Sequence, residues 1–330
     1  MSGAGFLAVD SGGSGLRVVV GTAVGDGSGP PGPRGLRVSG EPVRTGPRGI
    51  DPGHLLGQLL PMVRSLAEQT GMARLDTVVV GAAGLATLGE ALRAELPGAL
   101  ARELGVRTVA LAADAVTAYV GALGPRAGAV VAAGTGLIAV GTDLSRWRRA
   151  DGWGHLLGDC GSGAWIGRAG LEAALRAHDG REGGSAPLLA RAEECFGPAA
   201  GLPGRVYPRS DRPAVLASLA PEVALCAADD PVAARILRSA ARHMADSAAA
   251  VCPAGGEPRV AVTGGLLRMG DPLLVPLGEE LARRLPQARR TSAEGDPLDG
   301  SVRLATDLAT GSLTLPSDER MLWVTSLPSG

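Results

Sequence analysis

Two aspartates near the N-terminal end of the chain each close an apolar run that is typical of a buried strand. Asp10 ends the run 6–10, and Asp114 follows the run 108–113. A carboxylate at such a strand end can hold Mg²⁺ through water. A carboxylate beside a substrate hydroxyl can accept its proton. Asp10 is therefore the candidate metal residue and Asp114 the candidate general base, although Asp114 alone is also typical of a helix N-cap.

Glycine-rich turns follow two of the predicted strands. The first turn is Ser11–Gly15, and the second is Gly134–Gly136, after the apolar run 128–133. Without a Cβ atom, backbone N–H groups can approach a phosphate closely, and a hydroxyl adds another donor. Each turn alone is equally typical of an ordinary hairpin, but together they predict two loops that hold the phosphates of one nucleotide. The candidate nucleotide-binding residues are Gly12, Gly13, Ser14, Thr135 and Gly136.

The segment Gly152–Gly167, GWGHLLGDCGSGAWIG, carries the densest group of polar, aromatic and glycine residues. An indole such as Trp153 can lie against the apolar face of a sugar, and Asp159 can accept from hydroxyls. The Gly-Ser-Gly turn that ends at Gly163 can present N–H groups to an anion where a helix begins. A purely structural glycine-rich loop is the alternative. The candidate substrate-binding residues here are Gly152, Trp153, Asp159 and Gly163.

Paired glycines, Gly264 and Gly265, follow the apolar run 260–263. Glycines at the end of a strand let the backbone pass close to a flat group such as adenine. An ordinary strand-to-helix turn is equally consistent with them. We predict that Gly264 and Gly265 contribute to nucleotide binding.

Apolar strands alternate with helical segments along the chain, which predicts an α/β fold. Asp51 and Pro52 are a typical helix start. The strand, glycine turn and strand of residues 6–21 recur from residue 128 onward, so two domains on one plan are expected. The predicted units are an N-terminal domain 1–124, a C-terminal domain 125–312 with a helical insertion, and a tail 313–330.

Composition excludes several function classes. The chain of 330 residues has no lysine, so it has no P-loop lysine and no Schiff-base lysine. Net charge is −1 without a basic block, which argues against nucleic-acid binding. No apolar run approaches the ~18 residues of a membrane span. Four cysteines without CxxC spacing argue against zinc and favour reduced thiols, so a cytoplasmic protein is expected.

In order and in type, these motifs resemble the N-acetylglucosamine kinase branch of the BadF/BadG/BcrA/BcrD ATPase family, within the actin/hexokinase/Hsp70 superfamily. The resemblance implies an α/β fold of two actin/hexokinase-like (ribonuclease H-like) domains with a central interdomain cleft. It implies ATP and Mg²⁺ as cofactors, phosphorylation of the 6-hydroxyl of an amino sugar, and a homodimer. It assigns Asp114 as catalytic base, and sugar contacts to Gly152, Trp153 and Asp159; Thr135 and Gly163 are further candidates for sugar contact.

The chain departs from the family pattern at three places. The stretch Thr45–Gly49 lacks the usual sugar-binding Asn, Cys160 replaces a Glu, and Leu137 replaces a Ser. Arg48 in the first of these stretches suits a substrate that bears a carboxylate or a phosphate, because guanidinium binds such groups in a bidentate way. A muramic-type sugar is therefore included beside N-acetylglucosamine and glucosamine.

Two other functions remain open from the sequence. One is an ATPase that activates a partner reductase, as in another branch of the same family. The other is a non-catalytic sensor of sugar or nucleotide, which the altered Asn and Glu positions motivate.

Overall fold

The computed structural model describes residues 4–12, 15–24 and 32–327. By its internal contacts the chain forms two compact units. The first unit comprises the chain up to residue 127, residues 142–147 and the C-terminal segment from residue 292. The second comprises residues 128–141 and 148–291. The predicted boundary near residue 124 lies close to the observed one, but the C-terminal segment belongs to the first unit, where we expected a second domain to 312 and a tail.

A six-stranded sheet with the order β13-β7-β6-β1-β2-β3 forms the centre of the first unit. β1 runs antiparallel to β2 and parallel to β6, and β6 runs parallel to β7. These strands match the predicted apolar runs, because side chains buried on both faces of a central strand must be apolar throughout. The strands are β1 (Gly5–Gly12), β2 (Gly15–Thr22), β3 (Gly32–Ser39), β6 (Thr77–Ala82), β7 (Thr108–Ala113) and β13 (Leu322–Ser326).

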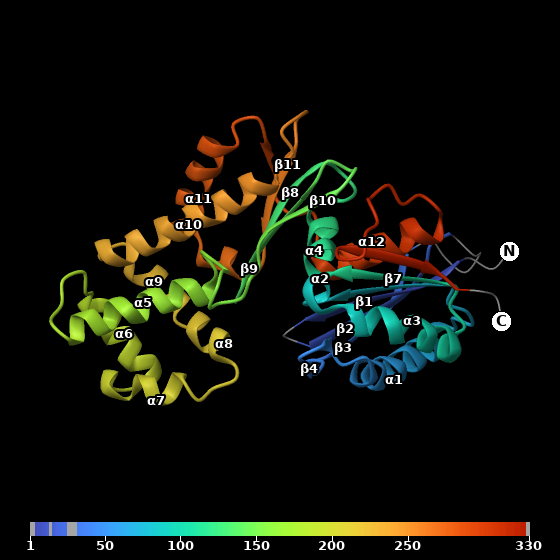
Figure 1. Cartoon of the computed structure of the whole chain (residues 1–330), viewed down its shortest axis with the longest axis horizontal. Coiled ribbons are helices and arrows are strands. Elements are labelled where there is room, and N and C mark those ends of the chain that lie inside the picture. The colour runs from blue at the N-terminus through green and yellow to red at the C-terminus, as the bar shows by residue number, and fades with distance from the viewer. Residues whose placement is uncertain (1–3, 13–14, 25–31, 328–330) are drawn as a thin grey trace. The chain divides into compact units, whose positions relative to one another are not determined.

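Helices cover both faces of this sheet, with α1 and α3 on one face and α4 and α12 on the other (Figure 1). α1 begins as predicted, because the Asp51 carboxylate accepts from the N–H groups of Gly53 and His54. After β6 the chain forms two helices, which are divided at Gly89. The remaining elements are α1 (Pro52–Thr70), α2 (Leu85–Leu88), α3 (Glu90–Leu104), α4 (Asp114–Leu123), α12 (Pro297–Ala309) and the hairpin β4 (Thr45–Gly46) with β5 (Gly49–Ile50).

The contact of α12 with α4 explains why the C-terminal segment belongs to the first unit. A Cβ atom at Gly300 would lie 1.9 Å from the Thr117 carbonyl oxygen, and one at Gly121 would lie 2.0 Å from the Asp296 carbonyl oxygen. Glycine on both helices therefore permits backbone-to-backbone packing. Since this contact joins residues far apart in the chain, the order of elements alone could not predict it.

The second unit contains a five-stranded sheet with the order β10-β9-β8-β11-β12. β8 and β11 are parallel, and α10 and α11 pack together beside them. The strands are β8 (Gly128–Ala133), β9 (Leu137–Thr142), β10 (Trp147–Asp151), β11 (Arg259–Thr263) and β12 (Arg289–Arg290).

The predicted helical insertion is present in the second unit as a group of helices that packs on α5 and α10. A Cβ atom at Gly167 would lie 1.7 Å from the Leu216 carbonyl oxygen, so glycine allows α5 and α8 to touch. The helices are α5 (Gly163–His178), α6 (Ala186–Phe196), α7 (Leu202–Val206), α8 (Arg212–Ala217), α9 (Ala220–Cys226), α10 (Pro231–Val251), α11 (Asp271–Arg284) and the short 3₁₀ turns η1 (Ala199–Gly201) and η2 (Gly265–Met269). Among the described residues, no helix combines the length and the apolar character that crossing a membrane requires.

Candidate active site

The first unit places both candidate carboxylates at one edge of its sheet. Asp10 aligns with Gly81 of β6, which aligns with Ala112 of β7. Asp114 therefore lies just beyond the level of Asp10, two strands away. Strands lie about 4.8 Å apart, so the strand ends that carry the two aspartates are about 10 Å apart across the sheet. The carboxyl ends of parallel strands are the usual position of ligand sites in α/β sheets.

Asp10 is held by Arg17, the residue opposite it on β2. Arg17 donates to Asp10 Oδ2 from Nε (2.9 Å) and Nη2 (2.6 Å), and from Nη1 to Asp296 Oδ2 (2.5 Å). Burial would raise the pKa of Asp296, but hydrogen bonds from Arg17 and from the first turn of α12 outweigh it and lower that pKa. One guanidinium therefore fixes the Asp10 carboxylate against the start of α12.

Asp114 is the first residue of α4 and is half-buried. The helix cap is Ala113, so Asp114 is not the N-cap that the sequence left as an alternative. Its Oδ1 accepts from the Ala115 N–H at 2.9 Å, and the Thr117 hydroxyl donates to its carbonyl oxygen at 2.9 Å. The carboxylate is thus held at the strand-to-helix junction, where a general base for a hydroxyl would be placed.

The turn after β1 is described only in part, since Gly13 and Ser14 lie outside the described residues. Gly12 is the last residue of β1 and pairs with Gly15 of β2. A Cβ atom at Gly12 would have no atom within 4 Å. Packing within the described chain therefore does not require glycine at this position.

The turn Gly134–Gly136 after β8 is joined to the start of α5. The carbonyl oxygens of Gly134 and Thr135 accept from the N–H groups of Gly163 (2.8 Å) and Ala164 (3.1 Å). Ser162 caps the helix by accepting from the Trp165 N–H at 3.1 Å. These first N–H groups of α5 are therefore used within the protein, which corrects our expectation that they would bind an anion.

Asp151 organises the glycine-rich segment that follows β10. Its carboxylate accepts from the N–H groups of Asp159 at 2.6 Å and Cys160 at 2.8 Å. Asp151 and Asp159 both have positive φ angles, 60° and 53°. Such conformations are rare for residues with a Cβ atom and persist where surrounding contacts enforce them. The segment is therefore a fixed loop.

Asp159 joins this loop to the turn after β8. Its side chain is buried, and Oδ1 accepts from the Gly154 N–H at 3.1 Å. Burial raises the pKa of Asp159, and the nearby Asp151 carboxylate raises it further, against the hydrogen bonds from the backbone of Gly154 and Leu137. A Cβ atom at Gly136 would lie 2.8 Å from Asp159 Oδ2. The carboxylate that we assigned to sugar contact therefore also ties the loop to the turn.

Trp153 is exposed over 63% of its surface, and the Arg149 guanidinium lies 4.6 Å from its ring centroid. Arg149 also donates to the carbonyl oxygens of Asp151 (3.1 Å) and Gly152 (2.6 Å). The indole is therefore stacked on one face by a cation. An exposed ring held in this way is suited to contact with a ligand.

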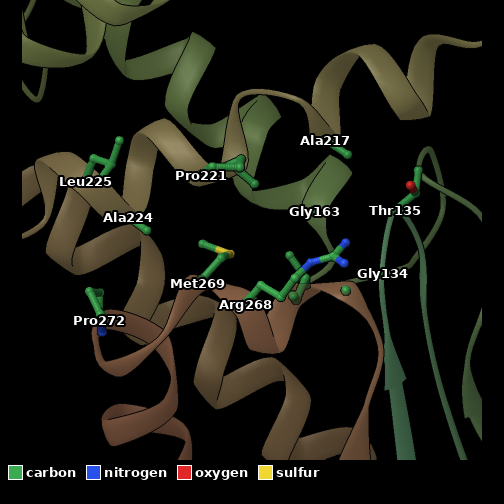
Figure 2. A pocket seen from close by; sticks show the side chains of 13 residues that line it. Gly134, Thr135, Gly163, Ala217, Pro221, Ala224, Leu225, Arg268, Met269 and Pro272 are labelled. Carbon is green, nitrogen blue, oxygen red and sulfur yellow. The ribbon is translucent and has the colours of Figure 1, made fainter. Parts of the chain in front are cut away.

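A pocket of about 490 Å³ lies in the second unit (Figure 2). Its lining includes the predicted residues Thr135, Gly163 and Gly265, together with Gly134, but not the predicted residue Gly136. The helices α8 and α9 form another wall, which the sequence did not predict. The remaining lining residues are Ala217, Ala220, Pro221, Ala224, Leu225, Leu266, Arg268, Met269 and Pro272. Its size lies within the range of small-molecule sites.

Gly264 lies beside this pocket but does not line it. Its φ angle is 110°, and a Cβ atom there would lie 2.2 Å from the Ala133 carbonyl oxygen. Glycine at 264 therefore serves the close approach of β11 to β8. Gly265, in contrast, begins η2 and faces the pocket.

Arg48 lies at the tip of the hairpin β4–β5 in the first unit and is exposed. Gly49, with φ 90°, brings the hairpin against the Leu88 carbonyl oxygen. Within the described chain Arg48 has no hydrogen-bond or ion-pair partner, so its guanidinium is available to an anionic group.

The described residues contain no cluster of three or more His, Cys, Asp or Glu side chains that could hold a metal ion. Mg²⁺ at nucleotide sites commonly keeps several waters and takes one or two carboxylates plus phosphates. Both Arg17 contacts fall on Asp10 Oδ2, and the other carboxylate oxygen, Oδ1, has no donor among the described residues. The donor set thus fits a water-rich Mg²⁺ site.

Five residues of the site were missed from the sequence. Arg17 could have been found from the sequence, because antiparallel pairing of the strands expected over residues 6–21 places it opposite Asp10. The other four are Arg149, Asp151, Arg268 and Asp296, whose contacts depend on a loop, a pocket wall and a distant helix.

The fold and these features together define an α/β protein of the actin/hexokinase-like class, built from two ribonuclease H-like units. Residues 9–286 match the model of the BadF/BadG/BcrA/BcrD ATPase family, and the chain belongs to that family.

Relatives of known description support this assignment. The N-acetylmuramic acid/N-acetylglucosamine kinase of Clostridium acetobutylicum is 44% identical over 69 residues, and this match spans 21% of the chain and only 22% of that enzyme. A proposed N-acetylglucosamine kinase from Chromobacterium violaceum has a TM-score of 0.68 at 26% identity, over 93% of this chain and 100% of that one. Another from Porphyromonas gingivalis has a TM-score of 0.68 at 16% identity, over 92% and 99%, and shows the fold alone.

Proposed function

We propose that this protein is an ATP-dependent kinase that phosphorylates the 6-hydroxyl of an amino sugar, N-acetylglucosamine or a close relative. The observation that carries the proposal is the pocket beside Gly134–Gly136, which places a glycine turn with a hydroxyl, a paired glycine and an apolar wall around one space. The family membership supports use of ATP. The names of the similar proteins support an amino sugar as the acceptor.

Asp114 is the proposed general base. A carboxylate beside the attacking hydroxyl accepts its proton as the oxygen bonds to the γ-phosphorus and ADP leaves. Asp114 is held by the Ala115 N–H and by the end of β7, so its position costs no rearrangement during the reaction. Asp10 is the proposed carboxylate for Mg²⁺, which when bound neutralises charge on the phosphates.

The fixed loop after β10 is the proposed sugar-binding element. Trp153, stacked on Arg149, offers an apolar and aromatic surface, and Gly152 offers its backbone. Thr135 and Gly163 line the pocket that we propose for the nucleotide. Their proposed contact is therefore with the end of the sugar that carries the 6-hydroxyl. The nucleotide is proposed to contact Gly12, Gly13, Ser14, Gly136, Gly264 and Gly265.

Arg48 is proposed to select for a sugar that bears a carboxylate, as N-acetylmuramic acid does. Its exposed guanidinium has no partner within the described chain. Arg48→Ala should therefore raise the KM for N-acetylmuramic acid at least tenfold and leave the KM for N-acetylglucosamine within about twofold. Equal changes in the KM values for both sugars would show that Arg48 does not bind the carboxylate.

The testing experiment measures ADP release over a panel of N-acetylglucosamine, glucosamine, N-acetylmuramic acid, N-acetylmannosamine and glucose. We expect ADP release that depends on one of the amino sugars and is slow without sugar. ADP release that no sugar stimulates would contradict the kinase and favour an ATPase that acts on a partner. Binding of a sugar or nucleotide without turnover would instead favour a sensor.

A further inference from the structure

Arg268 is the only charged side chain among the 13 residues that line the pocket of the second unit. It lies in η2, three residues after Gly265, and no acidic side chain lines the same pocket. Within the described residues its guanidinium has no carboxylate or carbonyl partner. The pocket therefore carries a net positive charge that nothing in its own wall neutralises.

The lining divides the pocket into a polar end and an apolar end. Gly134, Thr135 and Gly163 form the polar end, where the exposed residue Thr135 supplies a hydroxyl. Leu225, Met269, Pro272 and their neighbours Pro221 and Ala224 form the apolar end. No side chain of the apolar end offers a strong hydrogen-bonding group, so a flat base would be held there by shape and apolar contact.

The Arg268 side chain extends toward the polar end. In Figure 2 its guanidinium points to the side of Gly134 and Gly163 and away from Leu225 and Pro272. A Cβ atom at Gly265 would lie 3.2 Å from Arg268 Nη2, so the absence of a side chain at 265 gives the guanidinium this path. An unpaired guanidinium beside glycine backbone is a strong site for a phosphate.

We propose that Arg268 binds the phosphates of the nucleotide and supplies the positive charge that a lysine provides in many phosphate-binding loops. This inference rests on the proposed function, because it takes the pocket to hold a nucleotide. The chain contains no lysine, so an arginine must carry any such charge. The phosphates then lie at the polar end and the base at the apolar end.

The test compares the affinities of adenosine and ADP by titration calorimetry, for wild type and for Arg268→Gln and Arg268→Lys. Gln is a shorter, uncharged side chain that still offers an amide N–H donor. We expect Arg268→Gln to lower the affinity for ADP about 10- to 100-fold and to leave the affinity for adenosine within twofold of wild type. Arg268→Lys should recover part of the loss, and the dependence of ADP affinity on salt should decrease in Arg268→Gln.

Arg242→Gln is the matched control, since Arg242 is an exposed arginine of α10 that does not line the pocket. It should bind ADP as wild type does. The inference would be overturned if Arg268→Gln lost affinity for adenosine and ADP equally, or lost affinity for neither. If Arg268→Gln weakens ADP binding alone and the wild-type protein phosphorylates no sugar, Arg268 is supported as a phosphate ligand and the proposed kinase is contradicted. If Arg268→Gln binds ADP normally and the wild-type protein phosphorylates a sugar, the kinase is supported and the role of Arg268 is contradicted.

Discussion

Different groups fix the end of β1 in the first unit and the turn after β8 in the second unit. In the first unit an ion pair fixes the site, since Arg17 holds the carboxylates of Asp10 and Asp296. In the second unit the Asp159 carboxylate accepts backbone N–H groups and joins a loop to the turn. The pocket beside that turn carries one cation, Arg268. The first unit therefore presents acids and the second presents backbone and positive charge.

Asp114→Asn tests the chemical side of this difference and has the largest expected effect. Loss of a general base typically costs 10²- to 10⁴-fold in rate. We expect kcat to fall by that factor while ADP affinity stays within twofold, because the pocket that we propose for the nucleotide lies in the second unit. Rate measurements with saturating sugar and calorimetry with ADP check this. A variant with wild-type kcat would show that Asp114 is not the base.

Gly136→Ala and Gly12→Ala compare the two turns directly. At Gly136 the new Cβ atom would meet Oδ2 of the Asp159 carboxylate, whose other oxygen accepts from the Gly154 N–H, so we expect a loss of about 1–3 kcal/mol in the free energy of unfolding. At Gly12 the new Cβ atom has open space, so the free energy of unfolding should change by less than about 0.5 kcal/mol.

Denaturant unfolding of the two glycine variants, followed by circular dichroism, makes this comparison. Activity should fall in both, since a methyl group at either turn would keep a phosphate from the backbone. Equal destabilisation by the two substitutions would contradict the difference between the turns.

Arg17→Gln tests the ion pair of the first unit. Because Arg17 is partly exposed, its loss should lower the free energy of unfolding by only about 1 kcal/mol at pH 7. The pKa of Asp296 is lowered in the folded protein, so the stability that it contributes is present above its ordinary pKa and is lost as pH falls through the folded value. The difference between wild type and variant should therefore shrink on acidification toward pH 3. A constant difference across pH would exclude the ion pair as its cause.

Asp159→Asn tests the second unit and has the smallest expected effect. The pKa of Asp159 is raised by burial, so the folded state gains relative stability below the ordinary pKa of the carboxyl and loses it as pH rises through the raised value. The variant lacks this titration. Melting temperatures between pH 4 and pH 7 should therefore favour wild type increasingly toward the acid end. An unchanged difference would mean that Asp159 does not titrate in this range.

The sequence predicted what depends on local pattern. Apolar runs located the central strands, and Asp51 with Pro52 located the start of α1. Asp10 and Asp114 were proposed because each closes an apolar run, and the parallel strands β1, β6 and β7 bring the ends of these runs to one edge. The family assignment was confirmed by the match over residues 9–286.

Contacts between distant segments could not be predicted. The return of α12 to the first unit depends on Gly121 and Gly300, whose packing has no signature in the order of elements. No sequence motif distinguishes Arg268 from the other arginines, and its proposed role follows only from its position in the pocket wall. The N–H groups of α5 were expected to be free for an anion, but the turn after β8 accepts them.

Phosphorus NMR of one reaction mixture tests the proposed chemistry most directly. Wild-type protein, ATP, Mg²⁺ and the best amino sugar of the panel are followed in time. We predict that ADP and a sugar 6-phosphate appear in a one-to-one ratio, with phosphorus coupled to the two protons of carbon 6. Inorganic phosphate appearing with ADP, and no sugar phosphate, would contradict the kinase.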